Sequence, residues 1–326
     1  MSVISRKHAI AIGIFLAFVA LLVFGMLMPP RYSWRFAMMT WGERPTVGRV
    51  RVASDSGRII IRESLQLDQG AGLTRFSSFS KNCDRAQRWY DRDSLRLVGV
   101  GYDHIFVNMI GGVRALDVRT LEDGPLINDL LRSAGLSAVQ RYFTPDGNII
   151  VTTSRGKEIA MTGLGEVLDS VPEIPPLPRF SMFDGVQAED GTLFTMIHDG
   201  ALGTVHRDGK PLPGEAVLVG KFVGDASRNM PIVFPEGHVL LHSVDHLGKA
   251  SRFRLTRLGN DGDAWVLTSE SFLPGPTGAA RRLSWAALAD GNLVLLAGRQ
   301  DERGWQNTLS FVDPETGQVQ SNCALD

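Results

Sequence analysis

Histidines are the first residues to examine for chemistry, because imidazole can bind a metal ion or act as a general acid or base. Two of the seven histidines, His242 and His246, are four residues apart. This spacing would place two metal ligands on one face of a helix. The surrounding run, HVLLHSV (238–244), is rich in aliphatic residues and predicts a strand instead. On a strand, residues four apart are ~13 Å from each other, so we expect no shared metal ion here.

Other catalytic patterns are also missing from the sequence. It contains no G-x-S-x-G turn, no cysteine cluster and no calcium-loop pattern. Acidic residues repeatedly precede glycine, at Asp146, Asp190, Glu236 and Asp290. Such pairs favour tight turns, and we interpret their repetition as turn chemistry rather than as a set of catalytic carboxylates. The sequence therefore indicates no catalytic residue, no metal site and no cofactor, and it favours a protein that is not an enzyme.

Arginines are the most numerous charged groups, with 28 arginines against six lysines. Six of them stand near the start of a predicted innermost strand: Arg51, Arg96, Arg141, Arg179, Arg228 and Arg282. Guanidinium groups gathered at one mouth would attract an anionic ligand or an acidic loop of a partner. The alternative is an ordinary scatter of surface arginines in an arginine-rich chain.

The only two cysteines are Cys83 and Cys323. They fall in the first and last of the repeated units described below, which become neighbours if the units close into a ring. A disulfide bond between them would need an oxidising compartment. Because its loop is long, it would stabilise the fold by roughly 4–5 kcal/mol in the chain-entropy model. The alternative is two unrelated thiols.

Most of these residues lie within a repeated sequence pattern. Six times, a turn is followed by a short apolar run, and the second positions of the turns are 57, 104, 147, 191, 237 and 291. A period of about 45 residues with about four strands per unit is typical of a β-propeller, whereas a β-sandwich requires no steady period. We predict an all-β protein with six blades over residues 45–326. Seven blades are possible if residues 64–97 or 255–285 contain a degenerate unit, and residues 125–137 predict a short helix between blades.

Two segments carry a resemblance to a known family. FVDPETGQVQ (311–320) and VRALDVRTLEDGPLI (113–127) resemble the turn-and-strand pattern of quinoprotein-like (PQQ-type) propeller repeats, and DGTLFTMIHDGALGTV (190–205) resembles the other half of that repeat. The resemblance covers most of the chain after residue 45, and it implies a propeller with degenerate repeats. The tryptophan that ends the family pattern is missing after Gly124 and Gly317, so blade docking is expected to use other side chains.

The N-terminal region predicts a membrane anchor. Residues 9–28 contain no charge and have the length of ~20 residues that a transmembrane helix needs. A cleaved signal peptide is the alternative, but its apolar region is usually only roughly 7–15 residues long, and no A-x-A-like site follows here. We expect a retained signal-anchor helix with residues 1–8 in the cytoplasm. The propeller then lies on the periplasmic, extracytoplasmic side of the inner (cell) membrane.

The linker at 29–44 is rich in aromatic residues: Tyr32, Trp34, Phe36 and Trp41. Such rings favour the membrane interface, because one edge is apolar and the other can contact water. The alternative is that they dock on another membrane subunit.

The predicted function follows from the anchor and the repeat. A net charge of −1 gives no reason to expect nucleic acid as a partner. We predict a membrane-tethered extracytoplasmic β-propeller that serves as a protein-interaction or assembly subunit of a membrane complex. Its partners would be the bilayer, through the N-terminal helix, and another membrane or periplasmic protein. The alternative is a propeller enzyme, either a quinone-cofactor dehydrogenase or a metal-dependent hydrolase, or else an anion-binding sensor.

Overall fold

The computed structural model describes most of the chain between residues 46 and 325. The described ranges are 46–52, 57–66, 72–90, 95–100, 103–109, 111–144, 148–162, 165–172, 186–187, 192–199, 202–212, 217–218, 220–225, 230–234, 238–247, 250–259, 262–276, 278–302 and 304–325. The predicted anchor at 9–28 and the aromatic linker at 29–44 lie outside these ranges. Among the helices within them, none has the length and apolar character needed to cross a membrane.

Over the described residues the fold is all-β, with six successive antiparallel sheets, which we number in chain order, and one separate two-stranded sheet. Sheet 1 contains β1 (Thr46–Val52), β2 (Ile59–Gln66), β3 (Gly72–Phe79) and β4 (Arg85–Tyr90). Sheet 2 contains β5 (Arg96–Val100), β6 (His104–Met109), β7 (Gly112–Asp117) and β8 (Asp123–Leu126). Sheet 3 contains β9 (Ala138–Phe143), β10 (Ile149–Thr153) and β11 (Glu158–Met161).

The C-terminal half repeats this up-and-down order. Sheet 4 contains β12 (Val186–Gln187), β13 (Leu193–Asp199), β14 (Leu202–Arg207), β15 (Lys210–Pro211) and β16 (Val217–Leu218). Sheet 5 contains β17 (Gly220–Phe222), β20 (Val239–Leu247), β21 (Ala250–Gly259) and β22 (Gly262–Thr268). Sheet 6 contains β23 (Arg281–Ala289), β24 (Asn292–Asp301), β25 (Gly304–Val312) and β26 (Val319–Ala324).

Smaller elements lie between the sheets. The predicted helix between units is α3 (Ile127–Ser133), which follows sheet 2 and buries Ile127 and Leu131. A second helix, α4 (Ser269–Phe272), follows sheet 5. It lies within the longest step of the repeat, from 237 to 291, and so accounts for part of the extra length. The regions 64–97 and 255–285, where a seventh unit was possible, complete sheets 1 and 5 instead.

The fifth unit departs from the regular pattern. The segment before its turn forms a two-stranded hairpin, in which β18 (Gly224–Asp225) pairs with β19 (Met230–Pro231). This segment reaches β20 only through a single bridge between Val233 and Val239. The neighbour of β20 at that edge of sheet 5 is instead β17.

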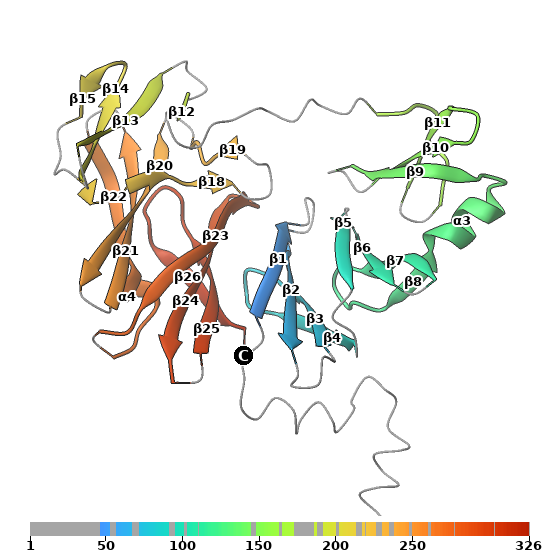
Figure 1. The fold of residues 1–326 in the computed structure, drawn as a ribbon, viewed down its shortest axis with the longest axis horizontal. Helices are drawn as coiled ribbons and strands as arrows, with labels where there is room; N and C mark the ends of the chain where they lie inside the picture. Colours follow the sequence, from blue (N-terminus) through green and yellow to red (C-terminus); the bar gives the residue numbers. More distant parts are fainter. Residues whose placement is uncertain are drawn as a thin grey trace, which may run out of the picture.

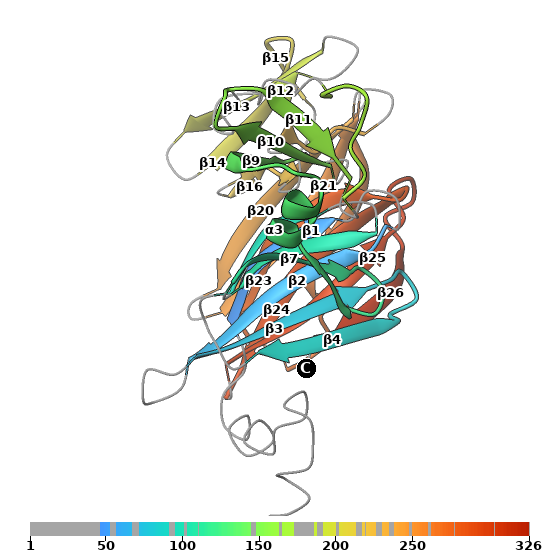
Figure 2. The same ribbon diagram turned by 90° about the vertical axis from the view of Figure 1, so that its right-hand side faces the viewer.

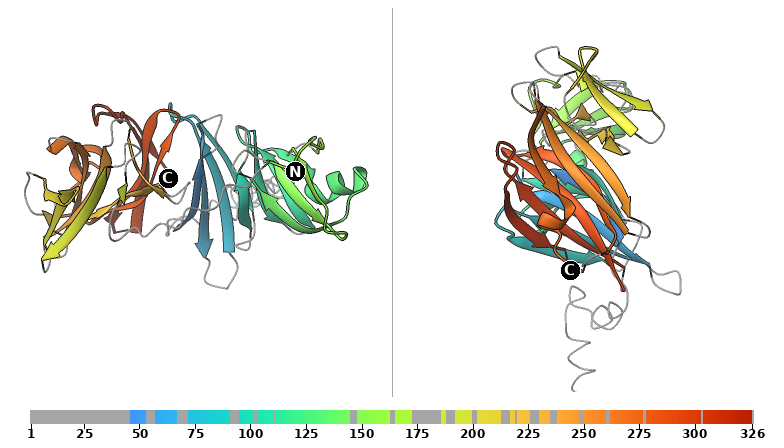
Figure 3. Two further views of the ribbon diagram at one scale, coloured as in Figure 1. Left: turned by 90° about the horizontal axis from the view of Figure 1, so that it is seen from above. Right: turned by 90° about the vertical axis from the view of Figure 1, so that its left-hand side faces the viewer.

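The six sheets stand face to face in an open arc, in the order 4, 5, 6, 1, 2, 3 (Figure 1). Figures 2 and 3 show the same row from the side and from above. Buried apolar clusters join sheets 4 and 5, 5 and 6, 6 and 1, 1 and 2, and 2 and 3. The first and last sheets of the chain are therefore neighbours in the middle of the arc.

Burial on both faces explains the continuous apolar runs of the central strands. In β24, Leu293 and Leu295 pack toward sheet 5, while Val294 and Leu296 pack toward sheet 1. A strand covered on both faces gains no advantage from alternating polar residues. The run NLVLLAG is accordingly apolar at almost every position.

Candidate functional site at the junction of the first and last sheets

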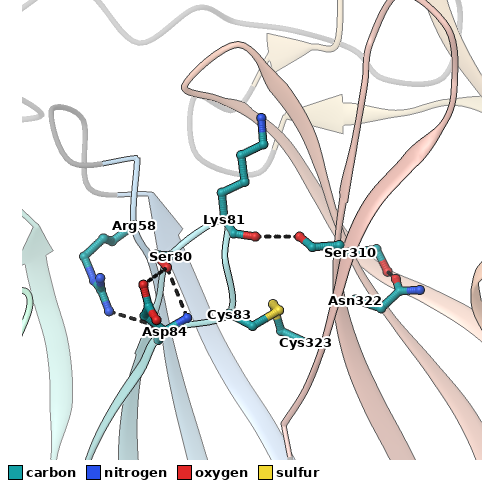
Figure 4. Close-up of a disulfide and its surroundings, with 9 residues drawn as sticks. Arg58, Ser80, Lys81, Cys83, Asp84, Ser310, Asn322 and Cys323 are labelled. Atoms are coloured by element: carbon teal, nitrogen blue, oxygen red, sulfur yellow. Dashed lines mark hydrogen bonds between the residues drawn. A yellow bond between two sulfur atoms is a disulfide. The ribbon is translucent and has the colours of Figure 1, made fainter.

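A disulfide bond joins sheet 6 to sheet 1. Cys323 lies on β26, and Cys83 lies in the turn between β3 and β4, with an S–S distance of 2.06 Å and a Cα–Cα distance of 5.3 Å. Figure 4 shows the two side chains meeting across the gap between the sheets. Beside them, the Ser321 hydroxyl donates a hydrogen bond to the Lys81 carbonyl at 2.6 Å. The sequence could only suggest this pairing, because it depends on the two sheets becoming neighbours.

An apolar core lies next to the disulfide. Sheet 1 contributes Ile59, Ile61 and Phe79, all almost completely buried, and sheet 6 contributes Phe311 and Leu325 among others. Apolar burial stabilises by roughly 25 cal/mol per Å², so this contact would hold the sheets together even without the covalent bond.

A buried ion pair completes the junction. The Nε atom of Arg75 on β3 lies 2.6 Å from the Oε2 atom of Glu63 on β2, and the two side chains are 7% and 2% exposed. Arg75 also donates to the Leu325 carbonyl at 2.7 Å, and Arg85 donates to the same oxygen at 2.6 Å. The Arg75 guanidinium lies 4.8 Å from the centre of the Trp89 ring. Two charge-assisted hydrogen bonds thus fix the end of β26 on sheet 1.

The position of Cys83 recurs in other sheets. Cys83 has a positive φ of 64° in the turn after the third strand of sheet 1. In the equivalent turns of sheets 2, 3 and 6, positive φ values occur at Leu121 (58°), Gly165 (96°) and Gly317 (70°). We call these four positions the turn residues.

Each turn residue is contacted by the outermost element of the preceding sheet along the arc. From sheet 1, Arg88 on β4 donates to the Leu121 carbonyl at 2.8 Å. From sheet 2, Leu130 on α3 lies where a side chain on Gly165 would be, 2.9 Å from its Cβ position. The disulfide bond at Cys83 is therefore a covalent version of a contact that other junctions make without a bond.

Sheet 5 makes the corresponding contact with an indole ring. Trp265 on β22 packs on Gly317, whose Cβ would lie 2.8 Å from the ring, and its indole N–H donates to the Pro314 carbonyl at 2.9 Å. A tryptophan of the preceding sheet thus packs on this turn, where the sequence has no tryptophan after Gly317.

Replacing Gly317 with alanine is expected to lower the free energy of unfolding by about 2–5 kcal/mol. A left-handed backbone costs about 1–2 kcal/mol for alanine, and displacing the Trp265 ring adds a packing cost of about 1–3 kcal/mol. The matched control is Gly156→Ala, because Gly156 has φ of 74° with no atom within 4 Å of its Cβ position. Urea unfolding should give a loss of only about 1–2 kcal/mol for the control, and equal losses would contradict the docking role of Gly317.

Asp117 and Asp313 stabilise two equivalent turns, one between β7 and β8 and the other between β25 and β26. Asp117 accepts hydrogen bonds from the backbone N–H groups of Arg119 at 2.8 Å and Thr120 at 2.7 Å. Burial raises the pKa of Asp117, but these hydrogen bonds outweigh that effect and hold the pKa below its usual value. For Asp313, the backbone hydrogen bond from Thr316 is the main cause of a lowered pKa. Both carboxylates thus fix turns, which is a structural role.

The four candidate mouth arginines that the structure describes do not lie at one level of their strands. Arg179 and Arg228 lie outside the described residues, while Arg51, Arg96, Arg141 and Arg282 lie on the first strands of sheets 1, 2, 3 and 6. Arg51 pairs with Ile60, beside the first turn of its sheet. Arg96 and Arg282 lie near the starts of their strands, whereas Arg51 lies near the end of its strand.

Two of these arginines contact neighbours within the chain. Arg282 stacks on Trp305 with its guanidinium 4.0 Å from the ring centre, and Arg141 donates to the Asn128 side chain at 2.5 Å. These contacts engage two of the four described arginines within the chain, and an anion-binding mouth stays a prediction.

Arginine instead serves the junctions between sheets, a role that the residue pattern does not predict. Guanidinium groups donate to backbone carbonyl oxygens of a neighbouring sheet at Arg62 (to Leu95, 2.6 Å) and at Arg257 (to Pro314, 2.7 Å). The same is true of Arg75, Arg85 and Arg88. Such contacts leave no pattern in the sequence, because the acceptor is backbone and can belong to any residue type.

The described residues contain no group of three or more His, Cys, Asp or Glu side chains that could hold a metal ion. His242 is buried in sheet 5, with its ring 5.6 Å from that of Phe253. The side chain of His246 and the four aromatic residues of the linker lie outside what the structure describes.

No protein-family model matches the sequence, and no curated protein matches it. Among solved structures, the chain is similar to the dihydro-heme d1 dehydrogenase NirN, at 12% identity and a TM-score of 0.33 over 86% of this chain and 67% of that one. It is also similar to MPT-4, a mannose phosphorylase from Leishmania mexicana, at 10% identity and a TM-score of 0.30 over 86% and 89%. A third is the β-propeller domain of the Trilobed protease from Pyrococcus furiosus, at 13% identity and a TM-score of 0.26 over 85% and 84%. Because each TM-score is below 0.5, neither the ring arrangement nor any activity follows from these similarities.

Proposed function

We propose that this chain is a membrane-tethered extracytoplasmic β-propeller that serves as a protein-interaction or assembly subunit of a membrane complex. The six sheets are its blades, and residues 9–28 are its anchor. The proposal combines a compartment, a tether and a binding role, and each of these has its own support.

The Cys83–Cys323 disulfide is the observation that carries the proposal. Disulfide bonds persist in oxidising compartments such as the periplasm and are rare in the cytosol. This bond is placed where it holds the first and last sheets together, so the fold benefits directly from an oxidising setting. A chain with an uncharged apolar segment before the first sheet reaches that compartment while remaining attached to the membrane.

The binding role is supported by turns that are exposed but fixed. Around Asp117 and Asp313 the backbone is held by hydrogen bonds, while the side chains of Arg119, Thr120 and Glu315 remain exposed. Exposed turns on a rigid scaffold are well suited to recognition, because little conformational freedom is lost on binding.

Fractionation of cells that produce the full chain tests the tether and the compartment. We expect the chain to stay in the membrane after alkaline carbonate washing, and to be digested by protease added from the periplasmic side. Its two cysteines should react with a maleimide only after reduction. A soluble chain, protection from the protease, or reactive thiols before reduction would contradict the proposal.

Native electrophoresis of membranes solubilised in mild detergent tests the binding role. We expect the full chain to migrate in a complex larger than its own detergent-bound monomer and to contain a second protein. Co-production of two differently tagged copies separates this outcome from self-association. Migration as a monomer, or a complex made only of copies of this chain, would contradict the interaction role.

A further inference from the structure

The sheets have two distinct ends. Because the strands within a sheet are antiparallel, its first and third turns lie at one end and its second turn lies at the other. The Cβ position of Gly57, in the first turn of sheet 1, is 2.6 Å from the Cβ atom of Asp290, in the first turn of sheet 6. Trp265, near the start of β22, packs on Gly317 in the third turn of sheet 6. Sheets 5, 6 and 1 therefore have the same orientation, and we name the two ends the first-turn end and the second-turn end.

Sheets 2 and 3 follow the same orientation. Ser78, close to the third turn of sheet 1, donates a hydrogen bond at 2.5 Å to the Val118 carbonyl, which lies at the third turn of sheet 2. At the other end, the Asn128 side chain donates to the Gly111 carbonyl in the second turn of sheet 2 and accepts a hydrogen bond from Arg141 of sheet 3. The second turns of neighbouring sheets therefore lie at one end of the molecule.

The first-turn end has more acidic than basic side chains among the described residues. The acidic ones in or beside the first and third turns are Asp84, Asp103, Asp117, Glu122, Asp123, Glu166, Asp208, Asp290, Asp313 and Glu315. The basic ones at this end are Arg58, Lys81, Arg85, Arg119, Arg207 and Lys210.

The second-turn end has the opposite balance. Its exposed and half-buried basic side chains are Arg96, Arg141, Arg155, Lys157, Arg252, Arg254, Arg282 and Arg299. The acidic side chains described there are Glu158, Glu270, Asp301 and Glu302, and Asp129 pairs with Arg132. A surface on which positive charge exceeds negative charge attracts anions. Three of the candidate mouth arginines thus belong to a broader basic end.

The chain enters the fold at this basic end. Thr46, the first residue of β1, pairs with Ser64 near the end of β2, and the second turn of sheet 1 follows β2. The predicted anchor at 9–28 and the linker at 29–44 precede Thr46 in the sequence. The tether of the proposed function would therefore reach the sheets at their second-turn end.

We propose that the second-turn end lies against the bilayer and binds anionic phospholipid headgroups. Each Lys or Arg side chain close to an anionic membrane adds to the attraction, and the tether keeps the headgroups at a high effective concentration. The occupant is the bilayer rather than an acidic protein, because the tether joins the sheets at this end. The exposed turns at Asp117 and Asp313 then point away from the membrane, toward the partner protein. The inference rests on the proposed membrane tether.

Hydrogen–deuterium exchange of the full chain in lipid nanodiscs tests this orientation. Nanodiscs of phosphatidylcholine are compared with nanodiscs in which phosphatidylglycerol replaces about a third of the lipid. We expect the anionic lipid to slow backbone exchange by at least about threefold at the second turns of sheets 2, 3 and 6. Salt at about 1 M should remove the difference, because it screens charges beyond roughly 3 Å. Equal exchange at the second turns in both lipids, or slowing confined to the third turns, would overturn the proposal.

Two variants with the same change of net charge show which end is responsible. The test variant replaces three exposed bases of the second-turn end: Arg96→Gln, Arg155→Gln and Arg254→Gln. The control variant replaces three exposed bases of the first-turn end: Lys81→Gln, Arg119→Gln and Lys210→Gln. The test variant should lose most of the slowing in anionic nanodiscs, and the control variant should keep it. Equal behaviour of the two variants would overturn the proposal.

The comparisons of lipid and salt use the unchanged chain, so they test the proposal even if a variant folds poorly. Slowing that appears only when an acidic protein copurifies would overturn binding to the bilayer. A chain removed by carbonate washing would contradict the proposed tether. Equal exchange in the two nanodiscs, with a chain that resists carbonate, would contradict this orientation alone.

Discussion

Replacing Cys83 with serine is expected to lower the free energy of unfolding by about 5 kcal/mol relative to the disulfide-bonded parent chain. The disulfide spans a sequence separation of 240 residues, and in the chain-entropy model a loop of this length restricts the unfolded chain by about 5 kcal/mol. The apolar core between the two sheets remains in the variant, so the expected loss is that of the bond alone. Urea unfolding of the full chain in detergent, followed by tryptophan fluorescence, gives the loss as a shift of the midpoint at constant slope.

Cys323→Ser and the double serine variant are the controls. All three variants remove the same bond, so their losses should be equal and not additive. Reduction should move the midpoint of the parent chain to that of the variants and leave the double variant unchanged. A parent chain that unfolds identically with and without reductant would show that the bond does not stabilise the contact between sheets 1 and 6.

The repeat could be predicted from the sequence because its signal is local. Acidic–Gly pairs mark the first turn of a unit, and the apolar runs between turns are long enough for one strand only. The apolar runs that follow the turns at 104 and 291 coincide with β6 and β24, which span His104–Met109 and Asn292–Asp301. The helix at α3 was predicted for the same reason, since its leucine spacing is visible over two turns.

Contacts between sheets could not be predicted in this way. The fifth unit shows why, because the apolar segment before its turn was as strand-like as its counterparts in other units. Tertiary packing nevertheless gives the edge of β20 to β17 and leaves Val233 with a single bridge. Strand propensity indicates that a segment can form a strand, whereas the strand with which it pairs depends on the packing of its neighbours.

The arginines illustrate the same limit at the candidate site. A guanidinium group that binds a backbone carbonyl across a junction, as Arg88 does at Leu121, cannot be told from a surface arginine by residue type or spacing. The alignment of arginines on first strands was a real regularity, at Arg51, Arg96, Arg141 and Arg282. Strand register places them at different levels, and register was the information that the sequence lacked.

Replacing Arg75 with methionine is expected to lower the free energy of unfolding by about 3–5 kcal/mol. Methionine keeps the length of the side chain, but it leaves the Glu63 carboxylate, at 2% exposure, buried without its guanidinium partner. Removing one member of a buried pair costs this much because the remaining charge stays out of water. The Leu325 carbonyl also loses one of its two arginine donors. Urea unfolding of the full chain measures the loss.

Two comparisons decide whether burial of the charge is the cause. Arg132→Met removes the arginine of an ion pair with Asp129 whose side chains are 80% and 58% exposed, and it should cost at most about 1 kcal/mol. Adding Glu63→Gln to Arg75→Met should recover part of the lost stability, because the buried side chain at position 63 is then neutral. If the double variant is less stable than Arg75→Met alone, Glu63 stabilises sheet 1 through contacts other than this ion pair. The contact between sheets 1 and 6 then depends on its apolar core and its disulfide bond.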